Sequence, residues 1–124
     1  MAGLTLDTGA LIALERRRQR MRKVVDVATR DALSITVPLV VLAEWWRGAS
    51  DLRDLIRRMV TIEAMDEPLA VAAGEAMARV AKASVADAIV MASAARRGDV
   101  VYTSDFDDLQ RLQAVFPAVR VLAV

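Results

Sequence analysis

Acidic side chains follow several apolar segments of this chain, at points where a strand would end or a helix would begin. They are Asp7 in GLTLD, Glu44 in PLVVLAEWW, Asp87 in SVADAIV and Asp105 after VVYTS. Carboxylates in such positions can cap helices, and they can also ligate a hard divalent cation such as Mg²⁺. The residue types therefore leave two explanations open for each acid.

Helix capping accounts for each aspartate taken singly. Asp7 could cap TGALIAL, and Ser84 and Asp87 have the S-x-x-D spacing of a variant capping box. Asp105 and Asp108 could cap DFDDLQRL in the same way. A purely structural role is therefore open at all of these positions.

Glu44 differs from the aspartates because its neighbours in PLVVLAEWW are apolar and predict a buried position. A buried carboxylate without a partner is costly. A salt bridge to an arginine would resolve that cost, and so would a metal ion.

The absence of two residue types restricts the possible chemistry. The chain has no cysteine and no histidine, which excludes thiol nucleophiles, thiolate zinc sites, Ser-His-Asp triads and imidazole-based catalysis. The working groups of an enzyme must then be carboxylates, hydroxyls, amines or guanidinium groups. Carboxylates gathered at one place repel each other unless a cation lies among them, and Mg²⁺ or Mn²⁺ prefers such oxygen ligands.

The elements that would position these acids alternate regularly between strand and helix. Strands are predicted at 4–6, 35–37 and 100–102, with further strands in VTIEAM and VRVLAV, and the segments between them have helical patterns. Helical crossovers favour an α/β fold with a central parallel sheet of about five strands and helices on both faces. The carboxyl ends of parallel strands share one edge, where ligands collect.

The overall composition fits one domain spanning residues 1–124, of which 56% are hydrophobic and 27% charged. No apolar run approaches the roughly 18 residues of a membrane helix. The first basic cluster follows the apolar stretch, which is the wrong order for a secretory signal. We therefore expect a cytoplasmic protein without a membrane anchor.

Four segments in this order resemble a PIN domain, and more specifically the VapC toxins of bacterial type II toxin–antitoxin systems. They are LTLDTGALIAL, VPLVVLAEWWRG, SVADAIVMASAARRGDVVYTSDFDDL and VRVLAV, and together they cover most of the chain. The resemblance implies a PIN-like α/β/α sandwich and a Mg²⁺- or Mn²⁺-dependent endoribonuclease. By this resemblance, the family's metal ligands correspond to Asp7, Glu44, Asp87 and Asp105. The hydroxyl residue that precedes the last acid in the family corresponds to Thr103.

The same resemblance implies a function for the whole protein. It would be a toxin that cleaves structured RNA, such as a loop of transfer or ribosomal RNA, with a metal-activated water as nucleophile. The expected partners are a VapB-type antitoxin and a second copy of the chain. Asp107 and Asp108 are expected to be accessory or capping residues. The alternative is a catalytically silent PIN-like module that binds RNA or protein.

The densest basic stretch is ERRRQRMRK. Because the formal net charge is only +1, attraction to nucleic acid must come from such local patches. The cations expected to contact RNA or the antitoxin are Arg16, Arg17, Arg18, Arg20, Arg22 and Lys23. A solvated helix face is the alternative explanation for this stretch.

Overall fold

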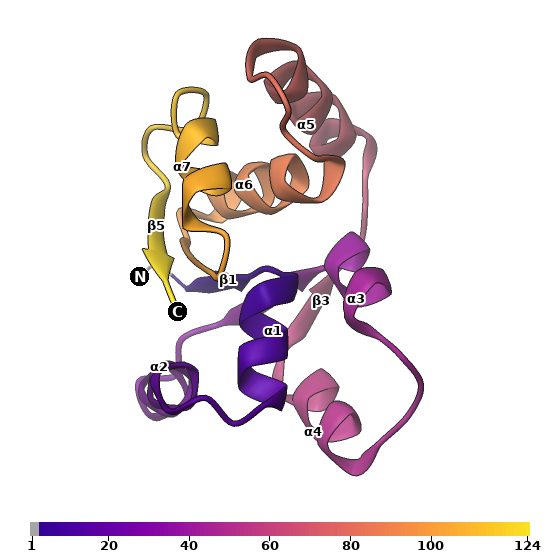
Figure 1. The fold of residues 1–124 in the computed structure, drawn as a ribbon, viewed down its shortest axis with the longest axis vertical. Coiled ribbons are helices and arrows are strands. Elements are labelled where there is room, and N and C mark those ends of the chain that lie inside the picture. The colour runs from indigo at the N-terminus through magenta and orange to yellow at the C-terminus, as the bar shows by residue number, and fades with distance from the viewer. Residues whose placement is uncertain (1–2) are drawn as a thin grey trace.

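The computed structural model describes residues 3–124 and forms an α/β/α sandwich around one parallel sheet (Figure 1). Its elements are β1 (Leu4–Leu6), α1 (Thr8–Glu15), α2 (Gln19–Arg30), β2 (Ile35–Pro38), α3 (Leu39–Trp45), α4 (Asp51–Met59), β3 (Thr61–Glu63), α5 (Glu67–Arg79), α6 (Val85–Arg97), β4 (Val100–Thr103), α7 (Phe106–Leu112) and β5 (Arg120–Ala123). The predicted fold class is confirmed.

The sheet has the strand order β3-β2-β1-β4-β5, and every neighbouring pair is parallel. The central strand β1 pairs with β2 on one side and with β4 on the other, where Leu6 lies opposite Tyr102. Because all five strands run the same way, the segments that follow β1, β2 and β4 leave the sheet at the same edge. Asp7, α3 and Asp105 belong to those segments.

Helices cover both faces of the sheet, with α5, α6 and α7 above β1 in Figure 1 and α1, α2 and α4 below it. Helix α6 contacts β1, β2 and β4. Its residues from Ala88 to Ala94 are all buried, as the nearly continuous apolar sequence of this helix predicts. Ser84 caps its first turn, and Gly98 ends it in the left-handed conformation at φ 73°.

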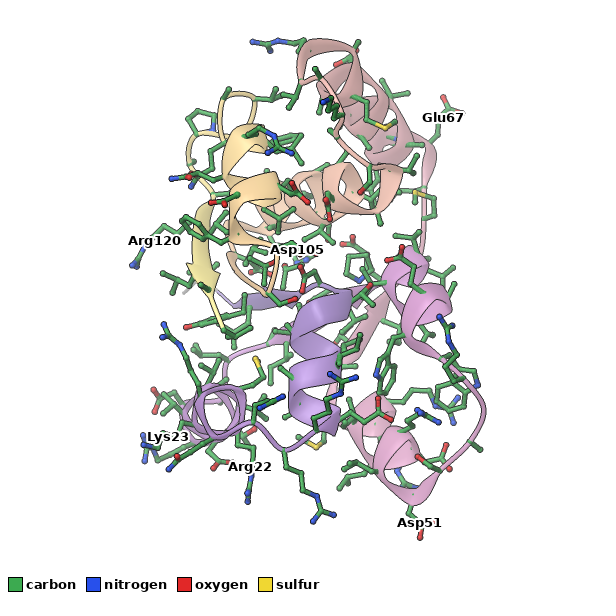
Figure 2. All side chains as sticks on the ribbon, in the orientation of Figure 1. Arg22, Lys23, Asp51, Glu67, Asp105 and Arg120 are labelled. Carbon is green, nitrogen blue, oxygen red and sulfur yellow. The ribbon has the colours of Figure 1, made fainter. Side chains whose placement is uncertain are left out.

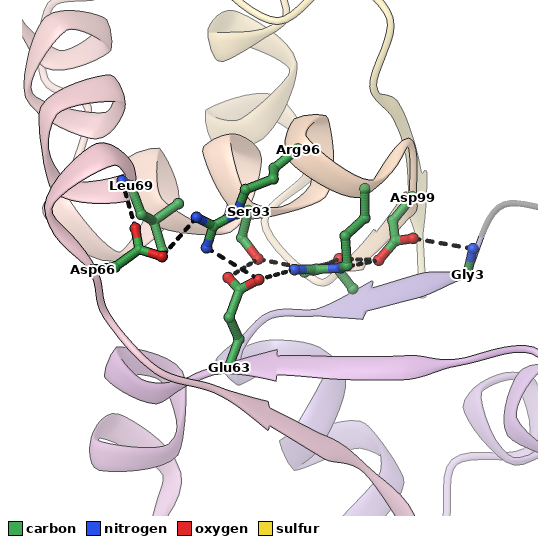
Figure 3. Close-up of polar contacts among 9 residues, drawn as sticks. Gly3, Glu63, Asp66, Leu69, Ser93, Arg96 and Asp99 are labelled. Carbon is green, nitrogen blue, oxygen red and sulfur yellow. Dashed lines mark hydrogen bonds and ion pairs between the residues drawn. The ribbon is translucent and has the colours of Figure 1, made fainter.

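A polar network lies between α6 and the sheet (Figure 3). Arg97 donates to the buried Asp99 carboxylate at 2.9 Å, to the Thr5 hydroxyl at 2.8 Å and to Glu63. Asp99 also accepts from the Thr5 hydroxyl at 2.8 Å and from the Gly3 amide at 3.0 Å. One guanidinium thus ties the end of α6 to β1, to β3 and to the start of β4.

Within residues 3–124, no helix is both long and apolar enough to cross a membrane. The two adjacent tryptophans, Trp45 and Trp46, differ in burial. Trp45 is buried in the main core, whereas Trp46 is half-buried and lies edge-on to Trp45 with the Arg57 guanidinium 5.3 Å from its ring.

Candidate active site

A cavity of about 570 Å³ opens at the carboxyl edge of the sheet, and five carboxylates line it. They are Asp7 after β1, Glu44 on α3, Asp87 in the first turn of α6, Asp105 after β4 and Asp108 on α7. We call this cavity the acid pocket. Figure 2 shows Asp105 between the ribbons of α1 and α7. The parallel sheet thus brings all four acids predicted as metal ligands to one cavity.

Asp7 lies deepest among these acids, with 4% of its surface exposed. Its Oδ1 accepts from the Ala10 amide at 2.8 Å and so caps α1, as its position predicts. Its Oδ2 accepts from the Thr103 hydroxyl. Asp7 therefore caps α1 and lines the acid pocket at the same time. Helix capping and cation ligation do not exclude each other at this residue.

Burial raises the pKa of Asp7 to about 6 because the charged carboxylate loses solvent. The hydrogen bonds from Thr103 and Ala10 lower this pKa, while the negative charges of Asp105 and Asp87 raise it. The hydroxyl and the amide thus favour the ionised form that burial disfavours.

Thr103 is fully buried and joins two of the acids. Its hydroxyl donates to Asp7 and accepts from the Asp105 amide at 2.8 Å. The Asp105 side chain makes no capping hydrogen bond to α7, so the capping explanation is wrong for this residue. Asp108 lies in the first turn of α7, pairs with Arg111 at 2.6 Å and also lines the acid pocket.

Asp87 is half-buried, and its side chain is not the cap of its helix. Ser84 is the cap, because its hydroxyl accepts from the Asp87 amide at 3.0 Å. Burial raises the pKa of the Asp87 carboxyl, a hydrogen bond with Ser84 lowers it, and the charges of Asp108, Asp105 and Glu44 raise it. Burial is thus the main cause of the raised pKa of Asp87, and the three neighbouring acids add to it.

Glu44 corrects one expectation from the sequence. It is exposed rather than buried, because α3 turns this side chain toward the cavity while Val41 and Trp45 face the core. Its Oε1 accepts from the Thr8 hydroxyl at 2.6 Å. Among the ion pairs of residues 3–124 none involves Glu44, so the predicted alternative of an arginine bridge is wrong.

The donor set of the acid pocket suits a hard cation, because its ligating groups are carboxylate and hydroxyl oxygens. Arg47 is the one basic side chain among the described residues that line it. Across residues 3–124, however, no three acidic side chains are close enough together to hold a single ion. The chemistry of the residues fits Mg²⁺ or Mn²⁺, whereas their spacing does not define a complete ligand shell.

Thr8, Gly9, Ser104 and Arg47 also line the acid pocket, although none of them was predicted as a site residue. Gly9 packs so closely on the turn after β4 that a Cβ there would lie 1.8 Å from Ser104 Oγ. Thr8, Gly9 and Ser104 lie next to or near predicted site residues in the sequence, and this proximity could have identified them as pocket residues. Arg47 carried no such signal.

The six cations of the basic stretch are all exposed, but they do not share one surface. Arg16, Arg18 and Arg20 line a groove of about 660 Å³ together with Gly9 and Ser104. The other three lie elsewhere: Arg17 and Arg22 line a groove between α2 and α4, and Lys23 lines a hollow beside Leu33 and Tyr102.

Comparison with known proteins gives a family and a fold. The PIN domain family model matches residues 4–115. The chain matches none of the curated proteins with which it was compared. Among solved structures it is similar to DNA-bound VapBC from Salmonella typhimurium, with a TM-score of 0.70, 18% identity, and coverage of 99% of this chain and 98% of that one. It is also similar to DNA-bound VapBC2 from Rickettsia felis (TM-score 0.74, 12% identity, 98% of each chain) and to FitAcB from Neisseria gonorrhoeae (TM-score 0.61, 20% identity, 96% of each chain). At these identities the similarity to solved structures establishes the fold.

Proposed function

The chain belongs to the PIN domain family, and we propose that it is a metal-dependent endoribonuclease that acts as a VapC-type toxin of a type II toxin–antitoxin system. The observation that carries the proposal is the acid pocket, which Asp7, Glu44, Asp87 and Asp105 line from four separate segments of the chain. A fold gains nothing in stability from gathering negative charges in one cavity. A reaction on a phosphodiester that needs a bound cation would explain why these carboxylates line one cavity.

Asp7, Glu44, Asp87 and Asp105 would hold Mg²⁺ or Mn²⁺ in this proposal. When bound, such an ion supplies positive charge to the phosphodiester and to the charge that develops as the bond breaks. The protein's own contribution is to orient the carboxylates. Thr103 holds Asp7 and the backbone of Asp105 together, and Thr8 holds Glu44.

Water is the proposed nucleophile, since the described wall of the acid pocket carries carboxylates and hydroxyls but no histidine. Attack by water on the phosphodiester leaves a 5′-phosphate and a 3′-hydroxyl. The proposed target is a structured RNA, such as a loop of transfer or ribosomal RNA. The proposed domain organisation is a single PIN domain spanning residues 1–124.

An antitoxin of the VapB type is the proposed protein partner, together with a second copy of the chain. The similar solved structures named above are VapBC, VapBC2 and FitAcB, and the resemblance of this chain to VapC toxins implies a VapB-type partner. Support from this chain comes from the groove of about 280 Å³ between α2 and α4. Leu55 and Met59 line it and are 48% and 42% exposed, which is typical of an apolar surface that a partner covers.

A catalytically silent module that binds RNA or protein is the second candidate, because sequence and fold do not by themselves guarantee turnover. The substitution Asp87→Asn separates the two functions. It removes one charge from the acid pocket, hardly alters shape and leaves the Ser84 cap in place. Asp51→Asn is the matched control, since Asp51 also lies in the first turn of a serine-capped helix and Figure 2 shows it at the bottom of the molecule, whereas Asp105 lies near the middle.

The experiment measures RNA cleavage with added Mg²⁺ or Mn²⁺, beside thermal melts with metal and with chelator. We expect Asp87→Asn to abolish cleavage and to melt at or above the parent temperature in chelator, because it removes a charge that burial and repulsion by neighbouring acids both disfavour. Asp51→Asn should cleave at the parent rate. A folded Asp87→Asn protein with the parent's cleavage rate would remove Asp87 from the metal site. A parent protein that binds RNA without cleaving it would favour the silent module.

A further inference from the structure

Three cavities adjoin along the exposed side of α1. The acid pocket shares Gly9, Ile12 and Ser104 with the groove that Arg16, Arg18 and Arg20 line, which we call the α1 groove. A smaller hollow of about 340 Å³ shares Glu44 and Arg47 with the acid pocket and Arg16 with the α1 groove. A continuous surface channel therefore leads from the carboxylates to the start of α2.

The sign of the charge changes along this channel. The acid pocket carries five carboxylates, whereas the described lining of the α1 groove contains three arginines and no acid. In residues 3–124 none of these three arginines takes part in an ion pair. Exposed cations without protein partners are free to neutralise an external chain of negative charges.

The backbone at Arg17 explains why the basic stretch divides between surfaces. Arg17 has φ 57°, in the left-handed region that side chains other than glycine rarely adopt. The turn that it forms ends α1 and directs Arg17 toward the apolar groove, where Arg22 also lies. Arg16 and Arg18 flank this turn and face the α1 groove instead. Arginines that are neighbours in sequence thus line different surface grooves.

We propose that the α1 groove holds the phosphodiester chain of the RNA on one side of the bond held at the acid pocket, with Arg16, Arg18 and Arg20 neutralising its phosphates. This inference rests on the proposed function. The groove suits a nucleic-acid strand because its cations repeat along a channel that ends where a phosphate must lie. The apolar groove with Arg17 and Arg22 suits a protein segment instead, because Leu52, Leu55 and Met59 line it.

The test compares two charge-matched triple variants drawn from the same stretch. One is Arg16→Gln, Arg18→Gln and Arg20→Gln, and the other is Arg17→Gln, Arg22→Gln and Lys23→Gln. The probe is a short fluorescein-labelled oligouridylate, and its dissociation constant is measured by anisotropy over a range of NaCl concentrations in EDTA. The chelator prevents metal-dependent turnover, so binding is measured apart from cleavage. Circular dichroism confirms that each variant is folded.

We expect the α1-groove triple to bind the oligouridylate more weakly and to flatten the plot of log affinity against log salt by about 2, since each single-strand phosphate contact contributes about 0.7. The other triple should keep the parent's slope. Equal slopes for the two triples would overturn the proposal, and so would a parent protein that does not bind the oligouridylate. A polyglutamate peptide that binds the parent more tightly than the oligouridylate, with the same loss in the α1-groove triple, would assign the groove to an acidic protein segment and also overturn it.

The cleavage assay tests the proposed function independently of RNA binding: the proposed function is wrong if the parent protein with Mg²⁺ or Mn²⁺ does not cleave RNA. In that case a slope change confined to the α1-groove triple would still support the RNA path.

Discussion

The Thr103 hydroxyl donates a hydrogen bond to the Asp7 carboxylate across 96 positions of sequence. The same hydroxyl accepts from the Asp105 amide, so a single side chain sets the relation between β1 and the turn after β4 at the acid pocket. This bond also lowers the pKa of Asp7 against the effect of burial.

Replacing Thr103 by valine should therefore raise the pKa of Asp7 further and leave the Asp105 amide without its acceptor. We expect the acid limb of the cleavage-versus-pH profile to move to higher pH, and the free energy of unfolding to fall by about 1–3 kcal/mol. Thr103→Ser keeps the hydroxyl and is the matched control, with the parent's profile. A Thr103→Val protein with an unshifted acid limb would show that the bond does not govern Asp7.

Asp7 makes the stability of the metal-free protein depend on pH in a defined direction. Its pKa rises from 3.8 to about 6 on folding, so between about pH 4 and pH 6 the folded state binds more protons than the unfolded state. Stability is then highest at the acid end of this window and falls as pH rises through it, by about 3 kcal/mol at about 1.4 kcal/mol per pKa unit.

The measurement is the free energy of unfolding of the parent minus that of Asp7→Asn, in EDTA, from pH 4 to pH 7. Asparagine keeps a side-chain oxygen for the Ala10 amide, so the α1 cap persists. A difference that stays level, or that rises with pH, would contradict the raised pKa. Added Mg²⁺ should reduce the loss, because a cation favours the ionised carboxylate.

Gly9 is expected to be intolerant of a side chain because of the turn that follows β4. A Cβ at Gly9 would lie 1.8 Å from Ser104 Oγ and 2.8 Å from Ser104 Cβ, so Gly9→Ala must displace the turn next to Asp105. We expect a loss of stability of about 1–3 kcal/mol and reduced RNA cleavage. Adding Ser104→Gly removes both clashing atoms and should restore much of each loss in a double-mutant cycle. Equal losses with and without Ser104→Gly would refute the packing explanation.

Arg97 and Arg96 are adjacent in sequence but should differ in their effect on stability. Arg97→Gln removes the cation that faces the buried Asp99, which should cost about 3 kcal/mol. Arg96 is an exposed partner of Glu63 and Asp66, so Arg96→Gln should cost less than about 1 kcal/mol. Denaturant unfolding of the two variants provides the comparison. Similar losses in both would show that the network between α6 and the sheet is not anchored on Arg97.

The order and type of the elements were predictable because their signals are local. Ser84 caps α6 and Gly98 ends it, and the hydrophobic periods of two and 3.6 residues distinguish strands from helices. Alternation of strand and helix favoured a parallel sheet, and the carboxyl ends of the strands in a parallel sheet share an edge. That reasoning predicted that the segments bearing Asp7, Glu44, Asp87 and Asp105 leave the sheet at one edge, and the structure shows these four acids lining one cavity there.

Contacts between segments that are far apart in sequence could not be predicted from the sequence patterns. The apolar neighbours of Glu44 suggested burial, but the rotation of α3 about its axis is set by packing against α1 and α6 and leaves this side chain exposed. The division of the basic stretch depends on one left-handed residue, Arg17, whose conformation no local pattern required. Asp108 was expected to serve its helix, yet the placement of α7 also brings it to the acid pocket.

The sequence by itself thus determined the fold class, the caps at Asp7 and Ser84 and the edge at which the acids gather, because these follow from short-range propensities and from strand direction. Only the tertiary structure decided which groups touch: Thr103 with Asp7, Thr8 with Glu44, and Ser104 with Gly9. These contacts depend on the register between β1 and β4 and on how the helices pack against the sheet. Register and packing are set by the summed burial of many side chains, and no single segment of the sequence encodes that sum.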